Sequence, residues 1–334
     1  MQPHALVADL NARRASLYWL DFSLSVGGGY LAFAAANRSG SLGLSAVLLI
    51  VSTLLLYRAA VFTHELAHMS QRSFKAFRLV WNLTCGIPLL IPSFLYEIHA
   101  EHHDRHTYGS ALDGEYLAFA TLPRSRAALF VMSSFAAVPA VFVRFLVLGP
   151  ISWIVHPIRP FVLSRASALV IDGEYRRRPP AGGIPRRWLI QEAACFAWCL
   201  LLTALALARV VHWTVFARAY AVLASILLIN AFRTLVAHRY EGDGLPMSLE
   251  AQVLDSNNYR GGLAALWAPV GLRYHAIHHL FPNLPYHSLG EAHRRLVADA
   301  SAAAMLGRTD RRSLGDALQD LLFRRHRARS RELS

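Results

Sequence analysis

The chain has 334 residues, of which 54% are hydrophobic and only 16% are charged, and its mean hydropathy is +0.32. This composition excludes an ordinary soluble domain and is typical of a multi-pass membrane protein. The net charge of +13 would suggest nucleic acid as the partner of a soluble protein, but here the arginines gather between and after the apolar runs. We therefore expect no nucleic-acid partner. The three cysteines contain no C-x-x-C pair and predict neither a disulfide framework nor a zinc ribbon.

Four apolar runs approach the roughly 20 residues that a helix needs to cross a bilayer. We predict spanning helices over residues 17–36, 42–62, 188–210 and 214–236. Two further apolar stretches, 79–98 and 127–154, each contain two prolines and are poor spanning helices. Basic segments flank both stretches on both sides, so each should cross the membrane an even number of times, as a re-entrant or interfacial hairpin.

The predicted fold is therefore an all-α integral membrane protein with about four transmembrane helices, re-entrant or interfacial hairpins, and a cytoplasmic cap that carries histidines. Residues 1–16 form a cytoplasmic segment, residues 17–300 the membrane domain, and residues 301–334 a polar cytoplasmic tail whose last stretch should be loosely ordered. The orientation follows from the excess of arginine on one side. We expect a multi-pass protein of a bacterial inner membrane. The arginines that indicate this orientation are Arg13, Arg14, Arg72, Arg78, Arg176 to Arg178, Arg186, Arg187 and those from Arg294 onward.

The histidines are not spread evenly along the chain. Of sixteen, eleven lie within residues 64–106 and 275–293, and most of these form three motifs: "HELAH" at 64–68, "HAEHH" at 99–103 and "HAIHH" at 275–279. On a helix, residues three or four apart share one face, whereas adjacent residues point about 100° apart. A pair such as His102 and His103 can therefore serve two different metal ions from one helical turn.

A ninth histidine, His238, ends the fourth predicted span and lies on the same side of the membrane as the three motifs. Nine imidazoles are too many for one tetrahedral zinc ion and enough for two metal ions. The predicted ligands are His64, His68, His99, His102, His103, His238, His275, His278 and His279. His106, His287 and His293 break the spacing and are expected to lie beside the site or on the surface.

A metal-bound imidazole usually donates its second N–H to a carboxylate or a carbonyl. Several acidic or amide residues lie close enough in the sequence to have this role. The main candidates are Glu65, Glu101, Asp104, Asp113, Asp255 and Asn258, with Glu97, Glu241 and Asp243 as further candidates.

"HELAH" also matches the H-E-x-x-H motif of zinc proteases, in which Glu65 would be the general base. The string "ALDG" at 111–114 would supply a third ligand, Asp113. This interpretation leaves the other seven histidines without a role and places the aspartate in a polar loop. A zinc-dependent membrane metalloprotease or hydrolase is therefore the remote alternative, and a metal-binding membrane protein without catalytic activity is another class to consider.

The order H-x-x-x-H, H-x-x-H-H and, after a pair of spans, H-x-x-H-H resembles the membrane fatty acid desaturase and hydroxylase superfamily over residues 61–296. The segments "PSFLYEIHAEHHDRHTYGSALDGEY" and "RYHAIHHLFPNLPYHSLGEAHRRL" are similar to bacterial members. This resemblance implies that the nine histidines hold two iron ions, which use O2 as a co-substrate. Some members carry an asparagine four residues before the counterpart of His238. Here that residue is Thr234, so water, Asn257 or Asn258 could take its place as a ligand.

The resemblance implies a fatty acid desaturase that uses O2 and two external electrons to place a double bond in an acyl lipid, acyl-CoA or acyl-carrier substrate. The alternative is a hydroxylase or ketolase of the same superfamily, acting on an alkyl, sphingoid or carotenoid substrate. The sequence has no flavin, dinucleotide or haem-domain motif, so a ferredoxin or small cytochrome with its reductase should supply the electrons. We expect this donor near the arginines Arg72, Arg105, Arg273 and Arg294, and an acyl channel lined by Trp19, Phe22, Tyr57 and Trp81.

Overall fold

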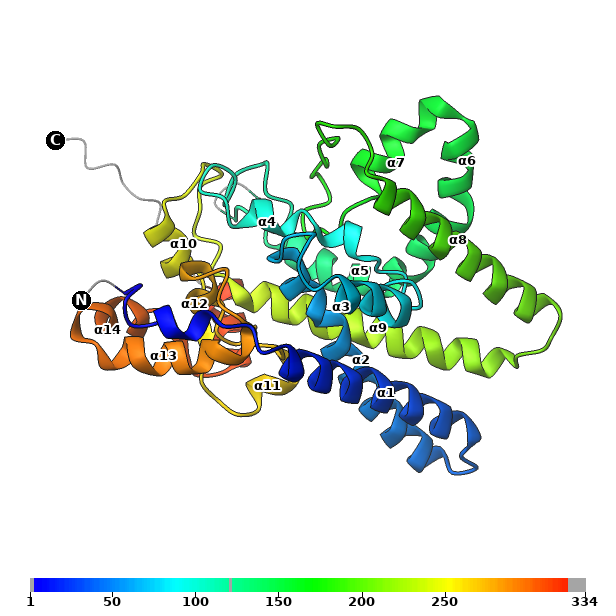
Figure 1. Ribbon diagram of the computed structural model, residues 1–334, viewed down its shortest axis with the longest axis horizontal. Helices are drawn as coiled ribbons and strands as arrows, with labels where there is room; N and C mark the ends of the chain where they lie inside the picture. Colours follow the sequence, from blue (N-terminus) through cyan, green and yellow to red (C-terminus); the bar gives the residue numbers. More distant parts are fainter. Residues whose placement is uncertain (1–2, 120–121, 324–334) are drawn as a thin grey trace.

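Two antiparallel pairs of long helices organise the protein in the computed structural model, which describes residues 3–119 and 122–323. The first pair is α1 (Ala15–Arg38) and α2 (Leu42–Ala67), and the second is α8 (Arg186–Leu207) and α9 (Trp213–Ala237). Figure 1 shows both hairpins extending in the same direction, with α10 to α14 (residues 249–307) gathered at their opposite end and α6 and α7 (residues 149–165) beside α8. Helix α2 packs against both α1 and α9. We call the end where α2 and α9 finish the histidine end.

Local sequence features explain where these helices begin and how closely they pack. The Ser41 side chain accepts a hydrogen bond from the backbone N–H of Leu44 and caps the start of α2. The His212 ring does the same for the N–H of Thr214 at the start of α9. Gly29 on α1 lies against Leu56, where an added Cβ would come within 2.7 Å of that side chain. Small residues of this kind let membrane helices approach closely.

The number of candidate membrane helices agrees with the sequence, but their identity differs in part. Among the described residues, four helices are long and apolar enough to cross a membrane: Leu42–Ala67, Ser125–Ile154, Arg186–Leu207 and Trp213–Ala237. The predicted first span does form a helix, α1, whose 24 residues would extend about 36 Å. It is not among these four candidates.

The apolar stretch 125–154 is a bent helical segment rather than two separate passes. It contains α5 (Ser125–Val143), a π-helical turn at Arg144–Leu148 and α6 (Gly149–Ile154), and Pro139 lies inside α5. Proline and π-helical turns are recognised causes of helix bending.

Contacts at both ends and in the middle of this segment show how it lies. Ala127 packs in one cluster with Leu235, at the histidine end of α9. The carbonyl of Phe135 accepts a hydrogen bond from the Tyr220 hydroxyl, near the start of α9. Trp153 then donates to Glu192, in the first half of α8. Both ends therefore lie toward the histidine end while the middle lies deeper, in agreement with a re-entrant segment.

The other proline-containing stretch, 79–98, does not form a spanning helix either. It contains the end of α3 (Lys75–Trp81), a π-helical turn at Asn82–Gly86 and a 3-10 turn at Ser93–Tyr96. The Asn82 side chain accepts from the backbone N–H of Ser93 at 2.9 Å and donates to its hydroxyl at 3.0 Å. These bonds close the stretch into a compact hairpin, as the sequence predicted. Two more short helices, α4 (His99–His102) and α7 (Arg159–Arg165), belong to the same half of the chain.

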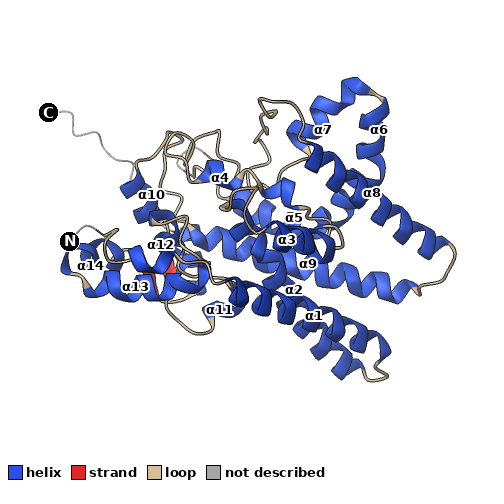
Figure 2. Ribbon diagram, viewed as in Figure 1, coloured by secondary structure: helices blue, strands red, loops and turns tan. Residues whose placement is uncertain are grey.

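The second half of the chain builds a cap from short helices, which Figure 2 shows together with a single pair of very short strands. The strands β1 (Asn258–Tyr259) and β2 (Asp310–Arg311) pair in parallel. The helices are α10 (Leu249–Asp255), α11 (Ala264–Trp267), α12 (His275–Leu280), α13 (Leu289–Ala298), α14 (Ala300–Gly307) and α15 (Leu314–Phe323). Short 3-10 turns occur at Ala8–Asn11, His156–Ile158 and Tyr286–Ser288.

Both ends of the described chain pack against this cap. Val7 lies in a hydrophobic cluster with Leu289 and Leu296, and Arg295 pairs with Asp9 at 2.6 Å. Residues of α15 pack against Val236 and Tyr259. The expectation of a loosely ordered tail is therefore wrong for residues up to 323, because an amphipathic helix buries its apolar face there. Residues 324–334 lie outside the described part of the chain.

Candidate metal centre

Four separated elements bring nine histidines together at one end of the helical hairpins. His64 and His68 come from the end of α2, and His238 directly follows α9. The "HAEHH" motif forms α4 and the residue after it, and the "HAIHH" motif forms α12. These nine residues are the ones that the sequence singled out, and the structure places all of them at this site.

The nine rings divide into two groups. Within each group, one nitrogen of every ring lies within 4.8 Å of the corresponding nitrogens of the others. The five-histidine group contains His64, His68, His99, His103 and His278, and the four-histidine group contains His102, His238, His275 and His279. Neighbours in the sequence thus fall into different groups, as the 100° rotation between adjacent helical residues predicts.

The distances between ring nitrogens within each group match those between ligands of one metal ion. In the five-histidine group, His278 Nε2 lies 3.0 Å from His68 Nε2 and 3.2 Å from His103 Nε2. In the four-histidine group, His238 Nε2 lies 2.9 Å from His275 Nε2 and 3.1 Å from His102 Nε2. Nitrogen ligands about 2.1 Å from one ion are separated by about 3.0–3.4 Å along the edges of its coordination shell.

The lowered pKa values of the histidine rings also favour metal binding. Burial, followed by mutual repulsion with other rings, lowers the pKa of His99, His103 and His275 well below the usual value, as it does for His238, His278 and His279. Neutral imidazole is the form that binds metal ions. Within the described chain, neither ring nitrogen of His64 has a hydrogen-bond partner. Buried polar atoms without partners are costly, and a bound ion would satisfy them.

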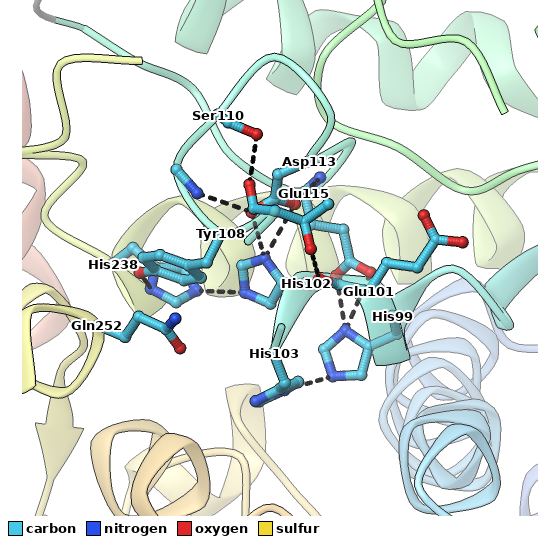
Figure 3. Close-up of polar contacts among 12 residues, drawn as sticks. His99, Glu101, His102, His103, Tyr108, Ser110, Asp113, Glu115, His238 and Gln252 are labelled. Carbon is cyan, nitrogen blue, oxygen red and sulfur yellow. Dashed lines mark hydrogen bonds and ion pairs between the residues drawn. The ribbon is translucent and has the colours of Figure 1, made fainter. Parts of the chain in front are cut away.

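A buried glutamate, Glu115, orients one ligand of the five-histidine group. Its carboxylate oxygens lie 2.9 and 3.0 Å from His99 Nδ1, opposite the Nε2 atom that faces His103 (Figure 3). The Tyr96 hydroxyl also donates to Glu115, at 3.1 Å. Burial raises the pKa of Glu115 to about 7. The sequence prediction missed this residue, although it lies two positions after Asp113 in the quoted segment "DGEY".

Asp113 has the corresponding role in the four-histidine group, as Figure 3 shows. Its carboxylate oxygens lie 2.9 and 3.0 Å from His102 Nδ1, and the backbone N–H of Glu115 donates to it at 2.9 Å. Burial opposes the charged form of His102, but Asp113, together with Glu115 and Asp255, outweighs burial and raises the pKa of this ring. Asp113 thus contacts His102 and not the group that contains His64, which argues against its role in the zinc-protease interpretation.

Tyr108 links His238 to Asp255. The Tyr108 hydroxyl lies 2.9 Å from His238 Nδ1 and donates to Asp255 at 2.8 Å, and the Ser256 hydroxyl lies 3.2 Å from the same ring nitrogen. Asp255, a predicted partner, therefore acts on the ring through a tyrosine that the sequence prediction did not include. Burial raises the pKa of Asp255 to about 6.

The two asparagines considered as substitute ligands are engaged elsewhere. Asn258 accepts hydrogen bonds from the backbone N–H groups of Ala276 and Ile277, and so positions the start of α12. Asn257 donates to the carbonyl of Val236 and accepts from Arg311. Both support the cap rather than face the histidine groups, so the proposal that either replaces the missing asparagine ligand is wrong.

The remaining candidates contact other residues or lie on the surface. Glu65 hydrogen-bonds to Tyr18 and to the backbone N–H of Tyr286. Glu97 pairs with Arg187 at 3.0 Å and accepts from Trp188, which ties the "HAEHH" motif to the start of α8. His293 pairs with Asp310, and His287 accepts from the backbone of Arg14. Four other candidates are exposed: Glu101, Asp104, Glu241 and Asp243.

An apolar cavity of about 400 Å³ reaches the five-histidine group. It lies between α2, α5 and α9, and its size is within the usual range for small-molecule sites. His64, Tyr96 and Glu115 line its histidine end. Of the four residues predicted to line a channel, only Tyr57 does so. Trp19, Phe22 and Trp81 instead pack in the core between α1, α2 and α3, where Trp81 donates to the carbonyl of Ala59 at 2.9 Å.

The fold and the histidines define a class of protein: a helical integral membrane protein with a histidine site that suits two metal ions beside a mainly apolar cavity. Residues 39–308 match the fatty acid desaturase family, and the chain belongs to this family. It is 39% identical over 337 residues to a ceramide hydroxylase of Caulobacter vibrioides (strain NA1000 / CB15N), an alignment that covers 99% of this chain and 95% of that protein. No solved structure matches the chain. Membership implies an oxidoreductase that acts on a lipid.

Proposed function

We propose that this protein is a membrane hydroxylase that inserts one oxygen atom from O2 into a C–H bond of a ceramide or a related sphingoid lipid. The observation that supports this proposal is the similarity to a ceramide hydroxylase along nearly the whole of both chains. It favours the hydroxylase alternative over acyl desaturation. The balanced reaction converts R–H, O2, two electrons and two protons into R–OH and water.

The nine histidines are proposed to hold two iron ions, one in each group. Bound iron would supply the oxygen chemistry that breaks an unactivated C–H bond, which acid–base groups cannot do. Imidazole nitrogens suit iron and zinc equally well, so the donor set alone does not choose between them. Zinc has no redox chemistry, whereas a metal that activates O2 at this site must change its oxidation state, and this requirement favours iron.

The side chains of the protein position the ligands and the lipid. Glu115, Asp113 and Tyr108 hold three of the rings in fixed orientations from their Nδ1 side, which leaves Nε2 directed into the groups. The apolar cavity beside His64 excludes water and holds a hydrocarbon chain close to the five-histidine group. Such positioning contributes a large part of the rate of any reaction at an otherwise unactivated carbon.

The distribution of arginines supports a proposal for the orientation of the protein in the membrane and for its electron donor. The loops at the far end of the two hairpins, 39–41 and 208–212, contain a single arginine, Arg209. Arg72 and Arg105 are exposed at the histidine end. We propose that the histidine end faces the cytoplasm, where an acidic ferredoxin or small cytochrome would find complementary charge.

Expression in a ceramide-containing host with a matched reductase and electron donor tests the function. Under ¹⁸O2, a hydroxylase yields ceramide with one ¹⁸O atom, whereas a desaturase yields ceramide that has lost two hydrogen atoms. His278→Ala removes a ring from the five-histidine group and should abolish the product, and Asp104→Asn on the exposed surface should not. Oxidised acyl-CoA or acyl-carrier products without any oxidised ceramide would contradict the proposal.

A further inference from the structure

Arg233, a buried arginine on α9, faces the cavity beside the histidine groups. Its side chain is only 7% exposed, and its Nε atom has no hydrogen-bond partner in the described chain. None of the ion pairs among the described residues includes Arg233. An arginine within a membrane helix is costly unless it is compensated, and for this reason such residues commonly mark functional sites.

A second buried arginine that lines the same cavity, Arg144, has a carboxylate partner. Arg144 pairs with the buried Glu192 at 2.6 Å and donates to the carbonyl of Ala166 at 2.8 Å. Arg233, in contrast, donates to the neutral side-chain oxygen of Asn230 at 2.9 Å. The charge of Arg233 acts on the nearby carboxylate of Glu115, but among the described residues the two form no direct ion pair of the kind that Arg144 makes.

The neighbours of Arg233 form a polar patch at the histidine end of a mainly apolar cavity, which Arg144 and Arg165 also line. Asn230, Arg233 and Thr234 all line the cavity, and their spacing places them on one face of α9. Tyr57 and Tyr96 line it as well, and the charge of Arg233 acts on both hydroxyl groups. The Tyr96 hydroxyl lies 3.2 Å from Nδ1 of His99, so this patch adjoins a predicted metal ligand.

We propose that Arg233 and Asn230 bind the amide and hydroxyl groups of a long-chain lipid amide, and that the carbon to be oxidised therefore lies near this polar group. The proposal rests on the proposed function and specifies how the substrate is held. An amide carbonyl accepts from the guanidinium, while the amide N–H and hydroxyl groups can exchange hydrogen bonds with the Asn230 side chain. Burying these groups against partners is favourable, whereas burying them in a wholly apolar cavity would be costly.

The position of the patch limits the site of oxidation. His64 lines the same end of the cavity as the patch, and the Tyr96 hydroxyl connects the patch to His99, whose Nδ1 lies 3.2 Å away. The new hydroxyl group should therefore lie close to the amide along the chain, and the rest of the hydrocarbon should occupy the apolar part of the cavity.

Ligand affinity without turnover tests the role of Arg233. The anaerobic holoprotein is titrated with a short-chain ceramide and with a fatty acid methyl ester of the same chain length, which lacks the amide and hydroxyl groups. Arg233→Met should weaken ceramide binding at least tenfold, leave methyl ester binding within twofold and keep the metal content unchanged. Arg233→Lys, which retains a donor and the charge, should lose less affinity for ceramide than Arg233→Met.

The matched control is Arg218→Met, also on α9, whose side chain binds Ala36 and Asn37 at the far end of the hairpin. This variant should leave the ratio of the two affinities unchanged. An equal loss for both ligands in Arg233→Met, or no loss for either, would overturn the proposal, as would a hydroxyl group placed far along the chain. If the wild type oxidises ceramide but Arg233→Met binds it normally, only this inference fails. If the wild type oxidises no ceramide, the proposed function fails first.

Discussion

His102 and His103 are neighbours in the chain but belong to different histidine groups. His102 Nε2 lies 3.1 Å from His238 Nε2, and His103 Nε2 lies 3.2 Å from His278 Nε2. Because α4 is only four residues long, one turn of helix contributes to both groups and fixes their separation. The same arrangement recurs at His278 and His279 on α12. This geometry explains why the motif needs two adjacent histidines, and it makes the two groups separately testable.

Removing the partner of one ring should affect one group only. Asp113→Asn weakens the hydrogen bond that orients His102, so we expect metal affinity of the four-histidine group to fall about 10- to 100-fold. Metal analysis after mild chelation should then find about one ion per chain where the wild type retains two. Asp104→Asn, on the exposed surface nearby, is the control and should retain both. Equal metal content in all three proteins would show that Asp113 does not support the site.

Metal removal should lower the stability of the whole protein. An ion at 100 times its dissociation constant stabilises the folded state by about 2.7 kcal/mol, because it binds only the assembled site. Treatment with a strong chelator should therefore lower Tm, and added ferrous iron under anaerobic conditions should restore it. His64→Ala should make this chelator-induced fall in Tm smaller, since His64 belongs to the five-histidine group. A Tm that is insensitive to chelation would mean that the site contributes nothing to folding.

Substitution of Glu65 distinguishes the hydroxylase interpretation from the zinc-protease interpretation. Its carboxylate accepts hydrogen bonds from Tyr18 and from the backbone of Tyr286 and, among the described residues, from no metal-site histidine, so its role in this structure is to join α1, α2 and the cap. We expect Glu65→Gln to reduce the free energy of unfolding by about 1 kcal/mol while metal content is retained and product formation is lowered only in part. A zinc protease would lose all hydrolytic activity on the same change. Product yield and metal content, measured on the same preparation, separate these outcomes.

The packing of the re-entrant segment, residues 125–154, against α8 should depend on one buried carboxylate, that of Glu192. It pairs with Arg144 at 2.6 Å and Arg159 at 2.8 Å, and it fastens residues 144–159 to α8. Glu192→Ala leaves two arginines without their carboxylate and should cost about 3–5 kcal/mol of unfolding free energy. Glu174→Ala is the control, because that side chain is 68% exposed in its ion pairs and such pairs contribute about 0–1 kcal/mol. Similar losses in both variants, measured by denaturation in detergent, would contradict this assignment.

The sequence alone established the class of site because its signals are local. Three- and four-residue spacing places histidines on one helical face whatever the rest of the chain does, so all nine candidates could be named before their arrangement was known. The length and composition of the apolar runs likewise predict membrane helices without any knowledge of packing. The same local logic, applied to basic segments, predicted that residues 127–154 turn back, and the contacts of Ala127 and Trp153 agree with it.

Only the tertiary structure decided which histidines share a group and which residues hold them. Glu115 reaches His99, Tyr108 joins His238 to Asp255, and Asn258 positions α12, although Asn258 is separated from Ala276 by 18 positions and Tyr108 from His238 by 130. Such pairs depend on how α2, α4, α9 and α12 pack, and no spacing rule encodes that packing. The cavity has the same origin, because its walls come from several helices and loops. For this reason the sequence named Trp19, Phe22 and Trp81, which lie in the core, and missed Arg233, which faces the site.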